Sequence, residues 1–322
     1  MKRILKVFGA ALLLLAVCGG GLLLWASAGS ARALSRTVDT HHVAFPIPLP
    51  IPAEEVERLG LSEAEAEDLA RERALERGRH LVSARYACAE CHGEDFGGGV
   101  MVDAPIMGRL LGPNLTTGAG SRTMAYTAAD WDRMVRHGVR PDGRPTGMPS
   151  EDFQLMSDQE LSDIVTYIRS LPPVDNVVPP VTLGPLGKVL VATGRLHLSA
   201  DRIATHDQPH SAAPPVSEVS VEYGRHLTGV CTGCHGGDLA GGPIAGGDPN
   251  WAPARNLTPH ATGLADWTYP QFVTAMRDGM RPDGTPLLPP MTSVVPYAQR
   301  MTDVEMEAIW VYLRSVPAVA TR

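Results

Sequence analysis

The sequence predicts an all-α protein in which two tandem copies of one helical domain follow an N-terminal transmembrane helix. Three observations support this fold class. The 322 residues suffice for two domains, several short motifs recur in the same order in both halves, and the recurring segments combine helix-start signals with apolar residues at helical spacing. Because no segment shows sustained strand alternation bounded by turns, we expect no strands in either copy.

Residues 1–34 predict a membrane anchor or an export signal. Three basic residues within the first six precede an uncharged apolar stretch from Val7 to Ala31, which includes Cys18. This stretch is long for a signal peptide and about right for a spanning helix, while the small residues 26–28 would permit cleavage. In either case the basic end stays inside. We therefore expect a cell-membrane protein with its body on the periplasmic side, or alternatively a soluble periplasmic protein.

The body of the chain is acidic, which excludes one class of partner. The net charge is −7, and without the three basic residues ahead of the apolar stretch 25 basic side chains face 35 acidic ones. A basic footprint for phosphate groups is absent, so we expect no nucleic-acid binding.

An internal repeat organises the rest of the chain. The shared motifs are, in order, GRHL (78–81 and 224–227), CxxCH (88–92 and 231–235), NLT (114–116 and 256–258), an RPDG-containing segment (136–145 and 277–286) and a final apolar helix pattern (158–172 and 303–317). The two CxxCH motifs end 143 residues apart. The repeat predicts one domain at 61–172 and a second at 217–322.

Helix signals fall at matching places in the two copies. Capping boxes, in which a Ser or Thr is followed three residues later by Glu, Asp or Gln, mark the start of a middle helix and of a last helix in each copy. They are Thr127-x-x-Asp130, Ser157-x-x-Glu160, Thr268-x-x-Gln271 and Thr302-x-x-Glu305. The middle helices are expected to stop at Gly138 and Gly279, and the last helices at Pro172 and Pro317.

Two proline-rich segments connect these parts. Residues 35–60 predict a stalk, and residues 61–79 a solvated helix that leads into the first repeat. Residues 173–216 predict an extended linker. Within it, residues 183–198 are apolar enough for one short helix, which we expect to pack against a neighbouring domain, with contact to the membrane surface as the alternative.

The strongest chemical signal is Cys88-Ala-Glu-Cys91-His92 and its second copy Cys231-Thr-Gly-Cys234-His235. CxxCH is the attachment signature of haem c. Two thiols on one tight turn can each form a thioether to a haem vinyl group, and the following histidine can then reach the iron. A thioredoxin-like redox pair would need a βαβ context. A zinc site would need the two cysteine pairs to lie closer together in the sequence. Simple disulfides would leave both histidines unexplained. We therefore expect two covalently bound haem c groups, with His92 and His235 as iron ligands.

The sixth iron ligand should recur in both copies. His137 aligns with Asp278, which removes it as a shared ligand. The recurring His80 and His226 lie just ahead of CxxCH, where a packing or propionate-facing role is expected. Two methionine pairs also align. Met156 and Met301 directly precede capping boxes, a position for apolar packing. Met148 and Met291 lie in Pro-rich loops, each 56 residues after its CxxCH histidine, and are the predicted distal ligands.

With these motifs the chain resembles tandem class I c-type cytochromes over residues 75–172 and 220–317. The resemblance implies that a backbone carbonyl holds the other nitrogen of each ligand histidine, namely that of Pro113 and that of Pro253. The second copy departs from the pattern, because Ala254 and Arg255 separate Pro253 from the NLT motif. Both NLT triplets match a glycosylation sequon but are interpreted as loop structure near the haem.

His/Met ligation fills both axial positions, which favours outer-sphere electron transfer over oxygen or peroxide chemistry. The sequence therefore predicts a dihaem electron carrier rather than an enzyme, working between a periplasmic or membrane dehydrogenase or quinol enzyme and a terminal oxidase or reductase. The alternatives are an electron-transfer subunit of a periplasmic dehydrogenase complex and, third, a dihaem peroxidase.

Overall fold

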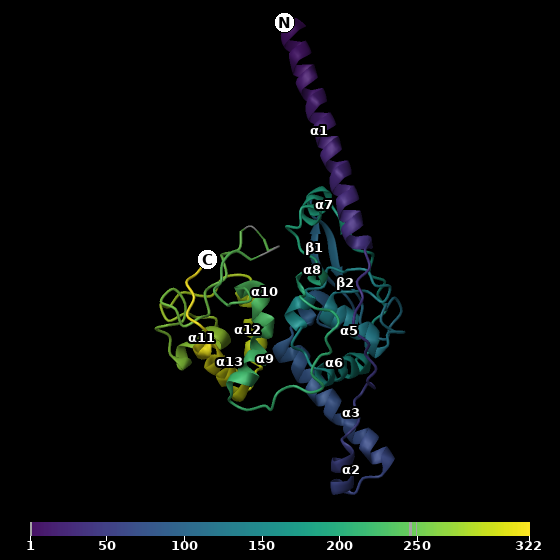
Figure 1. Cartoon of the computed structure of the whole chain (residues 1–322), viewed down its shortest axis with the longest axis vertical. Coiled ribbons are helices and arrows are strands. Elements are labelled where there is room, and N and C mark those ends of the chain that lie inside the picture. The colour runs from purple at the N-terminus through teal and green to yellow at the C-terminus, as the bar shows by residue number, and fades with distance from the viewer. Residues whose placement is uncertain (1, 245–246, 249) are drawn as a thin grey trace.

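The computed structural model describes residues 2–244, 247–248 and 250–322. Two helical lobes lie side by side, and a long N-terminal helix projects from the first of them (Figure 1). The mostly helical character, with tandem domains behind an apolar helix, confirms the predicted fold class.

The same helices recur in both lobes. The first lobe contains α3 (Glu63–His80) with a π-helical extension (Leu81–Arg85), α4 (Ala89–His92), α5 (Ala128–His137), a 3₁₀ turn (Ser150–Phe153) and α6 (Asp158–Ser170). The second contains α9 (Val221–Thr228), a 3₁₀ turn (Gly229–Cys231), α10 (Thr232–His235), α11 (Tyr269–Asp278), a 3₁₀ turn (Met291–Ser293), α12 (Val295–Ala298) and α13 (Asp303–Ser315).

All four predicted helix starts are confirmed, because in each the side chain of the third helical residue accepts from the backbone amide of the capping Ser or Thr. The two middle helices end as predicted at glycines with left-handed backbone, Gly138 (φ 64°) and Gly279 (φ 69°). Local sequence chemistry therefore fixes the ends of these helices.

In each lobe the first helix crosses the last one at a glycine. A Cβ at Gly78 would overlap the Asp163 carbonyl of α6, and a Cβ at Gly224 would overlap the Ala308 carbonyl of α13. The crossing brings apolar faces together in two cores, whose fully buried members include Leu161 and Val165 in the first lobe and Met306 and Leu313 in the second. The predicted packing role of Met156 is also confirmed, since it lies in the first core.

The expectation of no strands is wrong in the first lobe. Strands β1 (Gly99–Ala104) and β2 (Gly108–Gly112) form an antiparallel hairpin, and β3 (Thr182–Leu183) from the linker pairs with β2. The strands are too short for a readable alternation, and β3 is distant in sequence. This sheet is therefore stabilised by long-range pairing and by the close approach of Gly99 and Gly112 to the Cys91 carbonyl. A local sequence pattern does not account for it.

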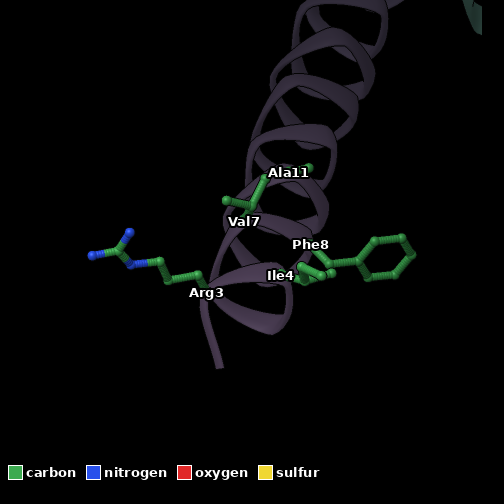
Figure 2. A pocket seen from close by; sticks show the side chains of 5 residues that line it. All are labelled: Arg3, Ile4, Val7, Phe8 and Ala11. Carbon is green, nitrogen blue, oxygen red and sulfur yellow. The ribbon is translucent and has the colours of Figure 1, made fainter. Parts of the chain in front are cut away.

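Helix α1 (Lys2–Ser35) is long and apolar enough to cross a membrane. A signal sequence near an N-terminus can have the same length and composition. Figure 2 shows its first turns, where Ile4, Val7 and Phe8 extend away from the helix. The groove between them is lined by α1 side chains alone. It is therefore part of the surface of an unpartnered apolar helix and not a ligand site.

The C-terminal end of α1 packs on the linker. Ala26 and Ser30 are buried there, and Gly29 lies directly against Ala192 of α7 (Pro185–Ala192). This confirms the predicted linker helix. Helix α7 is in turn held on the first lobe, because the Leu186 amide donates to the Ile106 carbonyl at 2.9 Å.

Residues 35–60 lie along the first lobe. The Val38 amide donates to the Gly143 carbonyl at 2.9 Å, the His41 amide to the linker carbonyl of His206 at 2.7 Å, and the Leu49 amide to Ser162 Oγ at 3.1 Å. The segment then forms α2 (Ala53–Leu59). A second short linker helix, α8 (Ser199–Arg202), packs nearby on the 3₁₀ turn of the first lobe.

The two lobes exchange a pair of His–Glu contacts. His80 Nε2 of the first lobe lies 2.8 Å from Glu305 of the second, and His226 Nε2 of the second lies 2.8 Å from Glu160 of the first. Both glutamates are the capping-box residues of the last helices and are buried. The expected packing role of the two histidines is confirmed, with the partner lying in the opposite domain.

Charge in this interface centres on Glu160. Its carboxylate also accepts from the guanidinium of Arg85 at 2.8 Å and from the Tyr86 hydroxyl at 3.3 Å. Burial alone would raise the pKa of Glu160, but the hydrogen bond from His226 and the charge of Arg85 together lower it to about 2. The same balance, with His80 as donor, lowers the pKa of Glu305. Both carboxylates are therefore ionised at neutral pH.

Replacing Glu160 by Gln is expected to destabilise the protein at neutral pH and to matter less in acid. The pKa of Glu160 falls from its ordinary value of 4.5 to about 2 in the folded protein. Ionisation of Glu160 therefore adds on the order of 3 kcal/mol to the free energy of unfolding above pH 4.5, and this stabilisation is lost as the pH falls toward 2. Thermal unfolding from neutral to acid pH measures this, with the exposed Glu67→Gln as control. The difference in unfolding temperature between the wild type and Glu160→Gln should shrink below about pH 4.5. A difference that stays constant there would contradict the lowered pKa of Glu160.

Candidate functional site

The two CxxCH motifs form equivalent one-turn helices. Cys88 and Cys231 sit at the N-terminal ends of α4 and α10, and His92 and His235 end them. A glycine with φ near 80° follows each histidine, Gly93 and Gly236. This left-handed position turns the chain sharply and leaves the imidazole at the end of the turn.

The state of the thiols argues against a disulfide or thioredoxin-like interpretation. All five cysteines of the chain, every one in the described part, are unpaired. Burial raises the pKa of Cys88 and of Cys231 to about 12, whereas a redox-active CxxC thiol has a lowered pKa. The raised pKa values therefore argue against thiolate exchange at Cys88 and Cys231.

A backbone carbonyl holds one nitrogen of each CxxCH histidine. His92 Nδ1 lies 3.0 Å from the Pro113 carbonyl, as the resemblance implied. His235 Nδ1 lies 2.7 Å from the Arg255 carbonyl, so the expectation of Pro253 is wrong. The position that matters is the residue directly before the NLT motif, and the two extra residues in the second copy move that position from proline to arginine.

Both imidazoles are in the form that binds a metal. A carbonyl can only accept, so Nδ1 carries the proton and Nε2 keeps its lone pair. Burial lowers the pKa of His92 and of His235, which keeps them neutral. Two free thiols at CxxC spacing beside a neutral imidazole with an available Nε2 fit a covalently attached haem c.

The NLT triplets build the loops that present these carbonyls. Asn114 is fully buried, accepts from the Thr116 amide at 2.9 Å and donates to the Val174 carbonyl at 2.7 Å. Asn256 makes the same two bonds in the second copy. It accepts from the Thr258 amide at 2.8 Å and donates to the Val319 carbonyl at 2.7 Å. The interpretation as loop structure beside the site is confirmed, and burial of both asparagines removes them as glycosylation acceptors.

Met148 and Met291 occupy equivalent loops between the middle and last helices of their lobes. Met148 directly precedes the Pro149–Ser150 entry to a 3₁₀ turn, and its carbonyl accepts from Ser150 at 2.8 Å. Met291 begins the corresponding turn of the second lobe. Both side chains are partly buried. Their role as distal iron ligands stays a prediction.

Each attachment turn is contacted by the opposite lobe. The Tyr297 hydroxyl of α12 donates to Glu90, inside the first CxxCH motif, at 3.1 Å. Asp152 of the first lobe lies against Gly233, inside the second motif. Burial and the neighbouring Glu151 raise the pKa of Asp152 to about 7, so this carboxyl is only partly ionised at neutral pH. The interface therefore fixes the two attachment turns relative to each other.

One grouping in the first domain has no counterpart in the second copy of the repeat. His137, fully buried at the end of α5, has His41, His206 and His210 around it. Comparison of the two copies missed this grouping, because His41 precedes the repeat and the other two lie in the linker. The only sequence signal was the concentration of histidines in the two connecting segments.

Comparison with protein families supports these sites. A family model described as "Cytochrome C oxidase, cbb3-type, subunit III" matches residues 73–168, and one described as "Cytochrome c" matches residues 221–317. Together the two matches cover more than half of the chain, and each contains one CxxCH motif.

Curated relatives carry related names. The chain is 30% identical over 260 residues to an alcohol dehydrogenase (quinone) cytochrome c subunit of Gluconacetobacter polyoxogenes, covering 72% of this chain and 54% of that protein. It is 27% identical over 285 residues to a gluconate 2-dehydrogenase cytochrome c subunit of Pantoea cypripedii (79% and 62%). It is 25% identical over 261 residues to a dihaem cytochrome c-type protein of Cereibacter sphaeroides (72% and 82%).

The chain thus spans about half the length of the alcohol dehydrogenase subunit. The prediction of two covalent haem c groups in tandem domains is confirmed by the two family matches and the dihaem relative. The chain belongs to the c-type cytochromes and contains two cytochrome c domains, each with one haem c attachment site.

Proposed function

We propose that the chain is the membrane-anchored, electron-carrying cytochrome subunit of a periplasmic dehydrogenase. One structural observation supports a relay most strongly: both attachment turns lie in a single interface and are contacted by the opposite domain, through Tyr297 at Glu90 and Asp152 at Gly233. Of the two carriers that the sequence anticipates, independent or dehydrogenase-bound, the names of the relatives favour the second.

The chain's own residues bind and orient two redox centres. Each bound haem c supplies an iron that gains and loses one electron. Cys88, Cys91, Cys231 and Cys234 hold the two groups covalently, and His92 and His235 each direct Nε2 outward because a carbonyl holds Nδ1. The His–Glu pairs across the interface keep both turns at a fixed separation, which a relay requires.

The second axial ligand would come from Met148 and Met291. A thioether ligand favours ferrous iron and raises the potential. If Met148 and Met291 join His92 and His235 as iron ligands, no ligand position would remain for a substrate, and the centres would suit electron transfer and not peroxide chemistry. Ser199 Oγ of α8 donates to the Met148 carbonyl at 2.5 Å and braces this loop from the linker.

The location of the partner follows from α1. We assign α1 as an uncleaved anchor with the cytochrome domains on the periplasmic side, because its outer two-thirds is unpartnered while its last turns pack on α7. The electron donor is then a catalytic dehydrogenase subunit and the acceptor a component of the same membrane. Only three lysines occur in the chain, so arginines would supply any basic docking contact.

Met148→Ala and Met291→Ala test the distal ligands. Each variant is expected to lose about half of the methionine–iron charge-transfer absorbance of the ferric protein and to lower one of the two reduction potentials. Absorption spectra and a redox titration measure both. The exposed Met124→Ala is the control and should match the wild type. If both variants keep the full band, other residues ligate the irons.

Purification from the native membrane tests the partner. An affinity-tagged chain should bring down a catalytic dehydrogenase subunit, and the haem absorbance of this preparation should become reduced when the substrate of that subunit is added. Alcohols, sugars and sugar acids form the first panel, as the relatives' names suggest. A chain that purifies alone and is reduced only by small chemical reductants would be an independent carrier.

A further inference from the structure

Four potential metal ligands converge where three separate segments meet on the first domain. His41 comes from the stalk, Asp132 and His137 come from α5, and His210 comes from the linker. Their ligand atoms all lie within 4.8 Å of one another. Asp132 and His137 are fully buried. The grouping is remote in sequence from both CxxCH motifs and has no counterpart in the second domain, where Val273 and Asp278 occupy the matching helix positions.

The spacing of the ligand atoms fits a tetrahedral site. His137 Nε2 lies 3.5 Å from Asp132 Oδ2 and 3.3 Å from His210 Nε2, and His41 Nε2 lies 3.9 Å from Asp132 Oδ2. Zinc binds imidazole nitrogen and carboxylate oxygen at about 2.0–2.2 Å, which places tetrahedral ligand atoms about 3.4 Å apart. Small rotations of His41 and His210 would complete this geometry.

Surrounding acceptors orient all three imidazoles with Nε2 inward. His41 Nδ1 faces the His206 carbonyl at 3.4 Å and His210 Nδ1 faces the Gln154 carbonyl at 3.1 Å. His137 Nδ1 lies 3.0 Å from His206 Nδ1, and His206 Nε2 lies 3.1 Å from the Ala200 carbonyl. Because the Ala200 carbonyl can only accept, His206 Nε2 carries the proton, and His206 Nδ1 must accept from His137 Nδ1. Each of the three inward Nε2 atoms therefore keeps a lone pair.

Asp132 supplies a buried and unsatisfied oxygen at the centre of the group. Its Oδ1 accepts from the buried Arg136 guanidinium at 2.8 Å, but Oδ2 has no hydrogen-bond partner among the described residues. A buried carboxylate oxygen without a partner is costly. Asp132 Oδ2 faces the Nε2 lone pairs of His137 and His41. A carboxylate oxygen and imidazole lone pairs are all acceptors, so they repel one another. A bound cation would resolve this arrangement.

We propose that His41, Asp132, His137 and His210 bind one divalent transition-metal ion, with Zn²⁺ the best match. Three imidazoles and one carboxylate suit zinc. All four ligands come from the protein, which is typical of a structural and not a catalytic zinc site. His206 acts as the supporting residue, because it holds both His41 and His137 through its carbonyl and Nδ1.

The ion would fasten the stalk and the linker to the first domain. These segments already meet through the His41 amide and the His206 carbonyl at 2.7 Å, and Arg36 at the end of α1 pairs with Asp201 of α8 at 2.5 Å. Helix α8 also braces the Met148 loop. The site would thus fix the membrane helix on the domain from which it projects.

Metal analysis of the detergent-purified, full-length dihaem protein tests the proposal. The protein is loaded with Zn²⁺, desalted and assayed for zinc and iron by mass spectrometry, with haem iron counting the chains. We expect one zinc for every two irons in the wild type and close to none in His41→Gln and Asp132→Asn. The exposed histidines at 42 and 197 provide matched controls, and His42→Gln and His197→Gln should retain full zinc.

Two further measurements separate a metal site from a folding effect. His206→Gln leaves all four ligands in place and should weaken zinc binding about 10- to 100-fold. Treatment with a chelator should expose residues 36–49 of the wild type to limited proteolysis, while haem spectra stay unchanged. The proposal fails if the loaded wild type holds no more zinc than His41→Gln, or if Asp132→Asn retains full zinc.

Discussion

The reciprocal pairing of His80 with Glu305 and of His226 with Glu160 joins the two cytochrome domains, and the relative position of the two haem attachment turns depends on it. Each glutamate caps the last helix of its own domain and bonds a histidine that lies a few residues ahead of the attachment turn of the other domain. Folding of each domain therefore prepares half of the interface. Because both carboxylates are buried, losing either histidine leaves a buried charge with fewer hydrogen bonds, which costs more than losing a surface ion pair.

The repeat explains why this interface is symmetric and why the rest of the chain is not. Duplicated helices give each domain the same carbonyl-held histidine and the same asparagine loop. The segments added outside the repeat contact the first domain: the stalk, α7 and α8 attach there and connect it to α1. The second domain consequently depends on its interface with the first domain, including the His–Glu pairs and the Tyr297–Glu90 contact, for its position relative to the membrane helix.

Local chemistry made much of this predictable. CxxCH spacing, the four capping boxes and the final glycines act within a few residues, so the sequence alone located the cysteines, their histidines and the helix ends. The partners of those groups lie far away in the chain. The Glu160–His226 pair, the switch from Pro253 to Arg255 and the β3 strand depend on tertiary contacts that no local pattern encodes. The His41, His137 and His210 grouping needed the fold to bring three segments together.

The central claim is that the interface joins two haem c sites into one electron relay. Injection of a single electron per molecule by pulse radiolysis, with the two haems followed separately by their absorbance, tests it most directly. The account predicts that the electron redistributes between the haems at a rate independent of protein concentration, as in an intramolecular step. A rate that rises in proportion to concentration would mean exchange between molecules and would contradict the relay.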